Sequence, residues 1–419
     1  MGYDRRECYG IGEGEQQMSG RYPAIVYTEE GMREGMQIED ANIPIDAKVA
    51  LLDALSETGL KRIVVGSFVS PRYTPQMARI DELMQKFHPK EGVTYTALAL
   101  NEQGVERAKK YSPPLTIERS ARPTLRVHMC DVFARRNTNR TQMQEMALWP
   151  KVIAKAKEQG ATEAGISTNA SFGSNFLGDF PVDAVMKFLE KEHDLWAAAG
   201  IKVTAVSVGD PMGWCHPIKI EEIFGRVKEQ WPDIKHFGAH LHNSRGMAIP
   251  SMYATIRTLG SDDTLRVEGT IGGMGGCPYC GNGQATGMAA TEDVMHMLDG
   301  MGIETGVNLD KLIECVWMCE EILGRHLWGH VSRTGPRPTS IKALYDMNAP
   351  FVETLQQATH FKRGPEVYAG AIYPWKEPIA SPYRERVEQG LPPFEVHGDW
   401  PWNEAFFPKP SAIMGSEPR

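Results

Sequence analysis

Two histidines separated by one residue, His240 and His242, form the most chemically suggestive pair in the chain. They end a run of strand-forming residues, His236–Asn243, and residues two apart on a strand point to the same side. Two converging imidazoles are typical of a metal site when an oxygen ligand joins them. Two buried, hydrogen-bonded histidines without a metal explain this pattern about equally well. A metal centre therefore needs a third ligand from elsewhere in the chain.

The segment Arg33–Gln37 follows the first expected strand and offers such a ligand. Glu34 can complete a site of two histidines and one carboxylate, with open positions for a substrate. Arg33 can balance negative charge that develops on a substrate oxygen, and Gln37 is expected to bind substrate. Taken alone, an adjacent Arg-Glu pair is more often a solvated surface ion pair.

A glycine-rich segment, Gly272–Gly283, follows the last expected strand. So many glycines predict a mobile loop that closes over a ligand. Its thiol Cys277 is placed to deliver a proton to a carbanion-like product. Cys277 and Cys280 also form a Cys-x-x-Cys pair, which suits a redox pair or half of a zinc site, although a single such pair is weak evidence for either.

Four further polar residues lie at or just beyond the ends of expected strands and are predicted to line the pocket. Ser67 and Ser70 are expected to bind substrate, although a helix cap and a turn explain them at least as well. Asp210 is expected to orient the substrate or Arg33. Asn243, directly after the histidine pair, is expected to bind substrate.

The elements that must position these residues alternate regularly between about residues 24 and 302. Eight strand–helix units predict a parallel α/β sheet closed into a (β/α)₈ barrel, which carries its site at the C-terminal ends of the strands. An open doubly wound sheet is the alternative, but the turn Glu30–Gly35 lacks a dinucleotide-binding glycine pattern. The expected strands are Ala24–Glu30, Arg62–Val69, Val93–Leu100, Thr124–Asp131, Glu163–Ala170, Lys202–Asp210, His236–Asn243 and Thr264–Gly273. The expected helices are Asp46–Leu60, Thr74–His88, Thr141–Gly160, Pro181–Gly200, Ile218–Trp231, Met247–Gly260 and Ala290–Gly302.

The pattern changes after Gly302. Asn308–Leu327 predicts one or two additional helices, and beyond Gly329 the chain is rich in proline and aromatic residues. A disordered tail would leave these rings in water, so we expect an irregular extension packed on the barrel or on a neighbouring subunit. The expected parts are an N-terminal extension (1–23), the barrel (24–305), additional helices (306–330) and the C-terminal extension (331–419).

The composition of the 419-residue chain excludes several classes of partner. It has 45 Lys and Arg against 53 Asp and Glu, a net charge of −8, with no basic run, which disfavours binding to nucleic acid or an anionic membrane. No stretch reaches the roughly 18 apolar residues of a membrane span, and residues 1–20 contain no apolar signal region. We expect a cytoplasmic protein whose seven cysteines are reduced thiols.

Together these residues resemble the hydroxymethylglutaryl-CoA lyase family, one branch of the metal-dependent lyase and synthase barrels that include isopropylmalate and homocitrate synthases. The resemblance runs, with gaps, from about Ile25 to Leu312. The matching blocks are Arg33–Gln37, Ser67–Pro71 with Pro75–Met77, His240–His242, Gly275–Tyr279, Ala290–Asp293 and Gly302–Leu309.

The resemblance implies a divalent cation, Mg²⁺ or Mn²⁺ in preference to Zn²⁺, and retro-Claisen or retro-aldol cleavage of a 3-hydroxy-3-methylglutaryl-CoA-like acyl-CoA or a related β-hydroxy acid. It assigns His240, His242 and Glu34 to the metal, Arg33 to the developing enolate and Cys277 to its protonation. It also implies a homodimer or higher homo-oligomer. A synthase that condenses an acyl-CoA with a 2-oxo acid, and a non-catalytic ligand-binding barrel, are the alternatives.

Three positions depart from the family pattern. Glu34 is one methylene longer than the usual aspartate ligand, and Val64 stands where the family carries a catalytic glutamate on its second strand. Met288 falls on the family's asparagine ligand, and a thioether is a poor partner for a hard cation. The segment before it is longer than usual, so Asn282 is the candidate for that ligand role.

Overall fold

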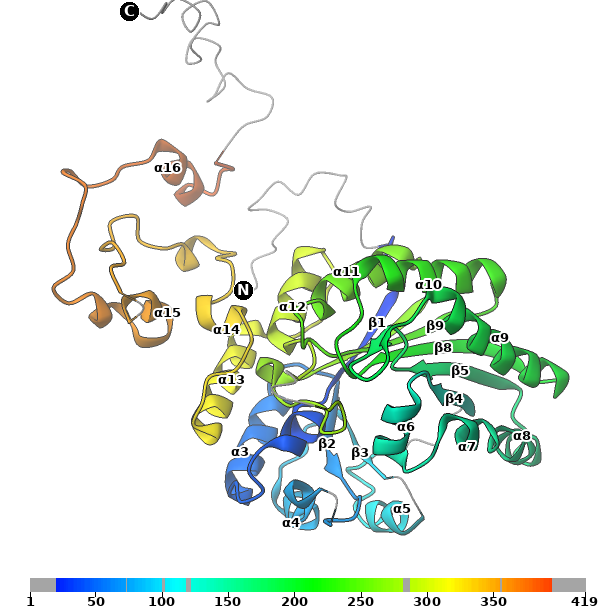
Figure 1. The fold of residues 1–419 in the computed structure, drawn as a ribbon. Coiled ribbons are helices and arrows are strands. Elements are labelled where there is room, and N and C mark those ends of the chain that lie inside the picture. The colour runs from blue at the N-terminus through cyan, green and yellow to red at the C-terminus, as the bar shows by residue number, and fades with distance from the viewer. Residues whose placement is uncertain are drawn as a thin grey trace, which may run out of the picture. The chain divides into compact units, whose positions relative to one another are not determined.

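The computed structural model of the chain describes residues 20–72, 74–99, 102–117, 122–281, 287–354 and 356–393 (Figure 1). The chain divides into two units. One is Met18–Pro336, which contains all the expected strands. The other contains the chain from Arg337 onward, and its described part is 337–354 and 356–393.

Eight parallel strands of the first unit form one sheet in the order β3-β2-β1-β10-β9-β8-β5-β4 (Figure 1). Strands β1 and β10 pair in parallel over six residues, from Ala24 with Thr264 to Glu29 with Gly269, so the first and last strands are neighbours. Within the described residues no ladder joins β3 to β4. The α/β barrel predicted from strand–helix alternation is confirmed. The strands are β1 (Ala24–Glu29), β2 (Arg62–Ser67), β3 (Thr94–Leu98), β4 (Thr124–His128), β5 (Glu163–Asn169), β8 (Lys202–Asp210), β9 (His236–Leu241) and β10 (Thr264–Gly269).

Helices follow the strands and cover the outside of the sheet (Figure 1). Helix α9 shows why they pack there: its apolar residues Val185, Leu189 and Trp196 recur at helical spacing and are almost fully buried. The indole of Trp196 also donates to the carbonyl of Gly165 on β5 at 3.0 Å. The helices around the strands are α3 (Ile45–Ser56), α4 (Ile80–Lys86), α5 (Glu102–Lys109), α6 (Asp131–Thr138), α7 (Gln142–Met146), α8 (Trp149–Glu158), α9 (Val182–Ala198), α10 (Pro217–Gln230), α11 (Ala248–Thr258) and α12 (Thr291–Gly300).

The structure differs from the expected elements mainly in the third, fourth and fifth units. The helix expected over Thr141–Gly160 is two helices, because Pro150 suits only the first turn of a helix and begins α8 as a new one. Helices α5 and α6 were not expected, and neither was a short antiparallel hairpin after β5. That hairpin pairs β6 (Gly173–Ser174) with β7 (Gly178–Asp179).

One long helix, α13 (Leu309–Leu323), follows the barrel. Asn308 caps its start, and Gly324 ends it in the left-handed conformation (φ 66°) that glycine adopts without strain. A short helix, α14 (Val331–Thr334), comes next. The indole of Trp317 donates to the carbonyl of Ser332 at 2.8 Å. These helices belong to the barrel unit, which ends at Pro336.

The described part of the second unit is irregular. It holds short helical turns, including α15 (His360–Arg363) and α16 (Pro382–Glu388). Large apolar side chains such as Tyr345, Phe351 and Tyr373 are exposed. Packing of this extension on the barrel or on another subunit stays a prediction. No helix among the described residues has the length and apolar character needed to cross a membrane.

Candidate metal centre

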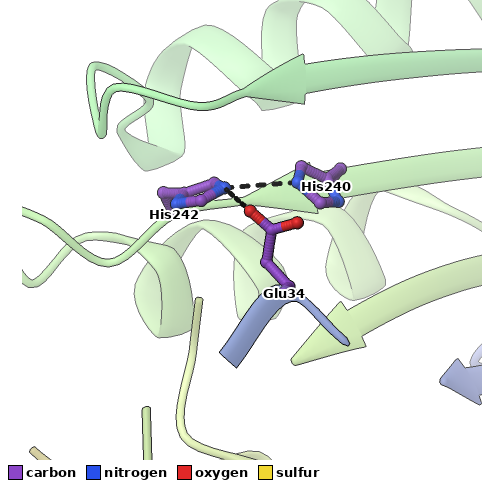
Figure 2. A group of neighbouring side chains, drawn as sticks. All are labelled: Glu34, His240 and His242. Atoms are coloured by element: carbon purple, nitrogen blue, oxygen red, sulfur yellow. Dashed lines mark hydrogen bonds and ion pairs between the residues drawn. The ribbon is translucent and has the colours of Figure 1, made fainter. Parts of the chain in front are cut away.

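The side chains of Glu34, His240 and His242 converge at the C-terminal end of the barrel strands (Figure 2). The Nε2 atoms of the two imidazoles lie 3.3 Å apart, and Nε2 of His242 lies 3.7 Å from Oε1 of Glu34. The side chains of His242 and Glu34 are almost fully buried, whereas 28% of the His240 side chain is exposed. Three donor atoms therefore meet at a site that stays open on one side.

The orientation of His240 is fixed by a neighbouring strand. Its Nδ1 atom lies 2.5 Å from Oε2 of Glu268. Val267 pairs with Ala239, so the next residues along β10 and β9, Glu268 and His240, are neighbours. A carboxylate at Nδ1 favours the tautomer with its proton there, which leaves the lone pair of Nε2 facing His242.

Glu34 is held in its anionic form by its surroundings. Burial by itself raises the pKa of this carboxyl, but the charges of Arg33, His242 and His240 outweigh burial and leave the pKa below its ordinary value. Arg33 donates from Nη1 to Oε2 of Glu34, and Gln37 donates from Nε2 to Oε1 at 2.7 Å. The third donor of the cluster is therefore a carboxylate.

A tight turn presents Glu34 to the histidines. The chain leaves β1 through a single π-helical turn, Gly31–Gly35, which buries Glu34. The glycine-rich loop crosses this turn so closely that a Cβ on Gly275 would lie 2.6 Å from the carbonyl oxygen of Glu34. Gly275 also has a φ of +89°, which side-chain-bearing residues rarely adopt. Glycine at this position lets the loop that carries Cys277 approach the site.

The donor set fits a divalent cation. Two bonds of about 2.0–2.2 Å to one ion span distances such as the 3.3 Å and 3.7 Å found here. Two imidazoles and one carboxylate match a site of two histidines and one carboxylate with remaining positions open to a ligand. Glu268 behind His240 supplies the outer carboxylate that commonly orients a histidine ligand.

The loop that carries Cys277 is tied to the barrel at several points. Gly276 accepts from Nε2 of Gln37 at 3.4 Å, and the carbonyl of Tyr279 accepts from Nε of Arg136 at 2.7 Å. The carbonyl of Cys280 accepts from Nδ2 of Asn175 at 3.0 Å. Cys277 itself is half-buried. Since Gln37 also bonds Glu34, one side chain joins the loop to the turn that carries Glu34.

Asp210 and Asn243 support the backbone around the histidines. Asp210 accepts from the amides of Trp214 at 2.9 Å and Cys215 at 2.7 Å, and its carbonyl accepts from the amide of His242 at 3.1 Å. Burial raises the pKa of Asp210 to about 6, although the backbone hydrogen bonds oppose this. The Asp210 carboxylate therefore holds the loop after β8. Orientation of the Arg33 guanidinium, expected from Asp210, comes from neighbouring glutamates instead.

Asn243 accepts from the amide of Ala248 at 3.0 Å through Oδ1 and so holds the start of α11. Ser67 is buried and accepts from the amide of Val69 at 3.2 Å, as in an ordinary turn. Ser70 is exposed. Contact of these three predicted substrate-binding residues with a substrate stays a prediction.

The departures from the family pattern have distinct surroundings. Val64 is buried in β2. Met288 is fully buried, and its backbone forms a β-bridge with His242. Asn282, the candidate for an additional ligand, lies outside the described residues.

Two glutamates of the site were not singled out from the sequence. Glu268 orients His240, and Glu30 bonds Nε of Arg33 at 2.9 Å. Glu29 of β1 pairs with Ile63 of β2 in parallel. One residue further along each segment, Glu30 is therefore next to Val64. The only sequence signal for either acid is its position at the end of a strand, and that signal becomes specific only when the strand register is known.

Comparisons with known proteins agree with this geometry. Residues 24–318 match the HMGL-like family. Hydroxymethylglutaryl-CoA lyase of Pseudomonas mevalonii is 30% identical over 291 residues, which are 70% of this chain and 90% of that protein. The solved HMG-CoA lyase of Bacillus subtilis is 27% identical with a TM-score of 0.59, over 74% of this chain and 98% of that one.

A solved HMG-CoA lyase of Acinetobacter baumannii, in complex with coenzyme A and 3-methylmalate, is 25% identical with a TM-score of 0.59. It covers 75% of this chain, and 96% of its own length is matched. The family match, the lyase relatives and the barrel fold agree, and the chain belongs to the HMGL-like family.

Proposed function

We propose that the protein is a metal-dependent carbon–carbon lyase that cleaves 3-hydroxy-3-methylglutaryl-CoA or a closely similar β-hydroxy acyl-CoA. The observation that carries the proposal is the convergence of Glu34, His240 and His242 beside Arg33, in a chain whose relatives are lyases. A condensing synthase and a non-catalytic barrel are not favoured, because the relatives named above are hydroxymethylglutaryl-CoA lyases.

Glu34, His240 and His242 would hold a divalent cation, Mg²⁺ or Mn²⁺. When bound, such an ion supplies a Lewis acid that fixes the oxygen atoms of the substrate and lowers the pKa of its hydroxyl. Glu268 keeps His240 in the ligating tautomer, and Gln37 and Arg33 hold the carboxylate of Glu34 in place. These contacts preorganise the donor atoms before the substrate arrives.

Cleavage removes the hydroxyl proton, turns that carbon into a ketone and leaves the electron pair of the broken bond on the thioester as an enolate. Arg33 is the fixed cation of the site and is assigned to the enolate oxygen. Cys277 is assigned as the acid that returns a proton to the enolate carbon, because its loop is tied through Gln37 to the turn that carries Glu34. The products are a 3-oxo acid and acetyl-CoA.

Turnover with product identification tests the proposal. Purified protein with Mg²⁺ or Mn²⁺ should convert 3-hydroxy-3-methylglutaryl-CoA to acetoacetate and acetyl-CoA, and chelation should stop the reaction. His242→Ala should lose both Mn²⁺ binding and turnover while the circular dichroism spectrum stays that of a folded barrel. Cleavage of citramalyl-CoA in preference would revise the substrate, and Mn²⁺ binding by His242→Ala equal to that of the parent would remove the assigned site.

A further inference from the structure

Glu30 is a buried carboxylate of the site beside the guanidinium of Arg33. It follows β1 directly and is 5% exposed. Its backbone is locked, because its amide donates to Gly269 on β10 at 2.8 Å and its carbonyl accepts from the amides of Arg33 and Gly35 at 3.0 and 3.1 Å. Its side chain therefore extends from a fixed point at the rim of the barrel.

The side chain of Glu30 makes one hydrogen bond among the described residues, and that bond goes to Arg33. Oε2 accepts from Nε of the guanidinium at 2.9 Å. Nη1 of the same guanidinium donates to Oε2 of Glu34. Two carboxylates that accept from different nitrogens of a guanidinium fix both its position and its plane. A single hydrogen-bond partner leaves the plane free to turn.

This arrangement leaves one edge of Arg33 available. No described residue accepts from Nη2, and 18% of the Arg33 side chain is exposed. Glu34 accepts from Arg33 through Oε2, and its other oxygen accepts from Gln37 and faces His242. Glu30 is the partner that is not shared with the metal-binding atoms.

We propose that Glu30 is a positioning residue for carbon–carbon cleavage: it fixes the guanidinium of Arg33 so that Nη2 meets the substrate oxygen on which the enolate charge develops. The inference rests on the proposed lyase function. The carboxylate acts through Arg33 and is not itself a metal ligand. Loss of an interaction that strengthens as charge develops lowers kcat and leaves KM nearly unchanged.

The first test replaces Glu30 by its neutral isostere. Glu30→Gln should lower kcat for 3-hydroxy-3-methylglutaryl-CoA roughly 10- to 100-fold, change KM less than about 3-fold, and leave the Mn²⁺ affinity measured by calorimetry unchanged. Glu30→Asp, which keeps the charge, should recover part of the lost kcat. The matched control is Glu192→Gln, which alters an equally buried carboxylate on α9 and should leave kcat unchanged.

A double-mutant cycle separates positioning from a general structural role. If Glu30 acts through Arg33, then adding Glu30→Gln to Arg33→Lys should reduce kcat less than about 2-fold further. An unchanged kcat in Glu30→Gln, or additive losses in the cycle, would overturn the proposal, and a lost Mn²⁺ affinity would make Glu30 a part of the metal site instead.

The same cycle can be measured without turnover. S-Carboxymethyl-coenzyme A cannot be cleaved, and its carboxylate carries a full negative charge like that of the enolate, so its affinity for the Mn²⁺-loaded protein responds to the contact with Arg33 that strengthens with charge. Glu30→Gln should weaken this binding several-fold in the parent and not in Arg33→Lys; equal weakening in both backgrounds would contradict the inference. An inactive parent protein that still shows this coupling would contradict the proposed function and leave the positioning role standing.

Discussion

His240 and Glu268 lie side by side on β9 and β10, with Nδ1 of the histidine 2.5 Å from Oε2 of the glutamate. The contact ties a predicted metal ligand to the strand that follows it in the chain. The Glu268 side chain is largely buried, and Arg266 donates to its second oxygen at 2.8 Å. Interaction with His240 and Arg266 overcomes the effect of burial and keeps the pKa of Glu268 well below its ordinary value.

Substitution of this glutamate should weaken metal binding without removing a ligand. In Glu268→Gln the imidazole of His240 loses its anionic partner, so Mn²⁺ affinity should fall roughly 10- to 100-fold. Isothermal titration calorimetry of the metal-free protein measures the effect. Glu163→Gln, a glutamate that begins β5 at the opposite end of the barrel, is the control. Equal affinities in Glu268→Gln and the parent would show that the contact does not support the metal.

Loss of the Cys277 thiol should slow the reaction after the bond is broken. Cys277→Ala should reduce product formation about 10²- to 10⁴-fold, the usual contribution of a positioned proton donor, while Mn²⁺ content stays unchanged. Steady-state kinetics and elemental analysis measure the two quantities. Cys315→Ala, which alters a buried thiol on α13, is the control. Parent-like kinetics in Cys277→Ala would remove this thiol from proton transfer.

Asn175 should hold the glycine-rich loop closed. Its Nδ2 donates to the carbonyl of Cys280, and its Oδ1 accepts from Trp214 at 3.0 Å and Arg245 at 3.1 Å. Asn175→Ala removes the hydrogen bond to the loop, and such a bond contributes about 0.5–1.5 kcal/mol. The loss should lower kcat/KM roughly 2- to 10-fold. Amide exchange in residues 275–281 should become faster in Asn175→Ala.

Asn175→Asp sharpens this test, because aspartate keeps the two accepted bonds and loses the donor to Cys280. Both variants should loosen the loop to a similar degree. The loop amides of Asn175→Asp could exchange as slowly as those of the parent while those of Asn175→Ala exchange faster. That result would show that the contacts with Trp214 and Arg245 hold the loop and that the bond to Cys280 does not.

Folding stability should depend on pH through Glu192. This carboxyl is fully buried; one oxygen accepts from the amide of Ser167 at 2.7 Å, and no described residue bonds the other. Burial raises its pKa from an ordinary value of 4.5 to about 8. The folded chain therefore keeps a proton that the unfolded chain loses between these values. The free energy of unfolding should fall by roughly 1.4 kcal/mol per pH unit across this window.

Glu192→Gln removes the titrating group and should remove this part of the pH dependence. Urea unfolding of parent and variant at pH 5, 6.5 and 8 gives the comparison. The free energies of unfolding of parent and variant should diverge as the pH rises, and the variant should be the more stable of the two at pH 8. Parallel curves would mean that Glu192 has the same pKa in the folded and unfolded chain.

The barrel was predictable because its strands are short β-branched runs at regular spacing. The expected end of each of the eight strands lies within four residues of the observed end because turn residues follow them. The largest difference is in the last strand, which was expected to reach Gly273 and ends at Gly269. Helix α5 has a polar sequence, Glu102–Lys109, and so lacks the apolar pattern that marked the others. The hairpin β6–β7 has only two residues in each strand, too few to show alternation.

The site was predictable to the extent that residue type and strand position determine it. His240 and His242 are two residues apart on one strand, and Glu34 follows another, so a shared location follows from the barrel. The contributions of Glu268 and Glu30 depend on which strand lies beside which and in what register. Asp210 has the type and position of a substrate-orienting residue, and its carboxylate accepts from two backbone amides; a contact with the substrate stays a prediction.

The pairing of β1 with β10 has a consequence for the order in which the protein is made. The ribosome delivers Glu34 more than 200 residues before the first histidine of the pair. The three donor atoms meet only when β10 has emerged and closed against β1. Nascent chains that stop before Thr264 therefore contain Glu34, His240 and His242 but lack the strand that pairs with β1 and closes this part of the barrel.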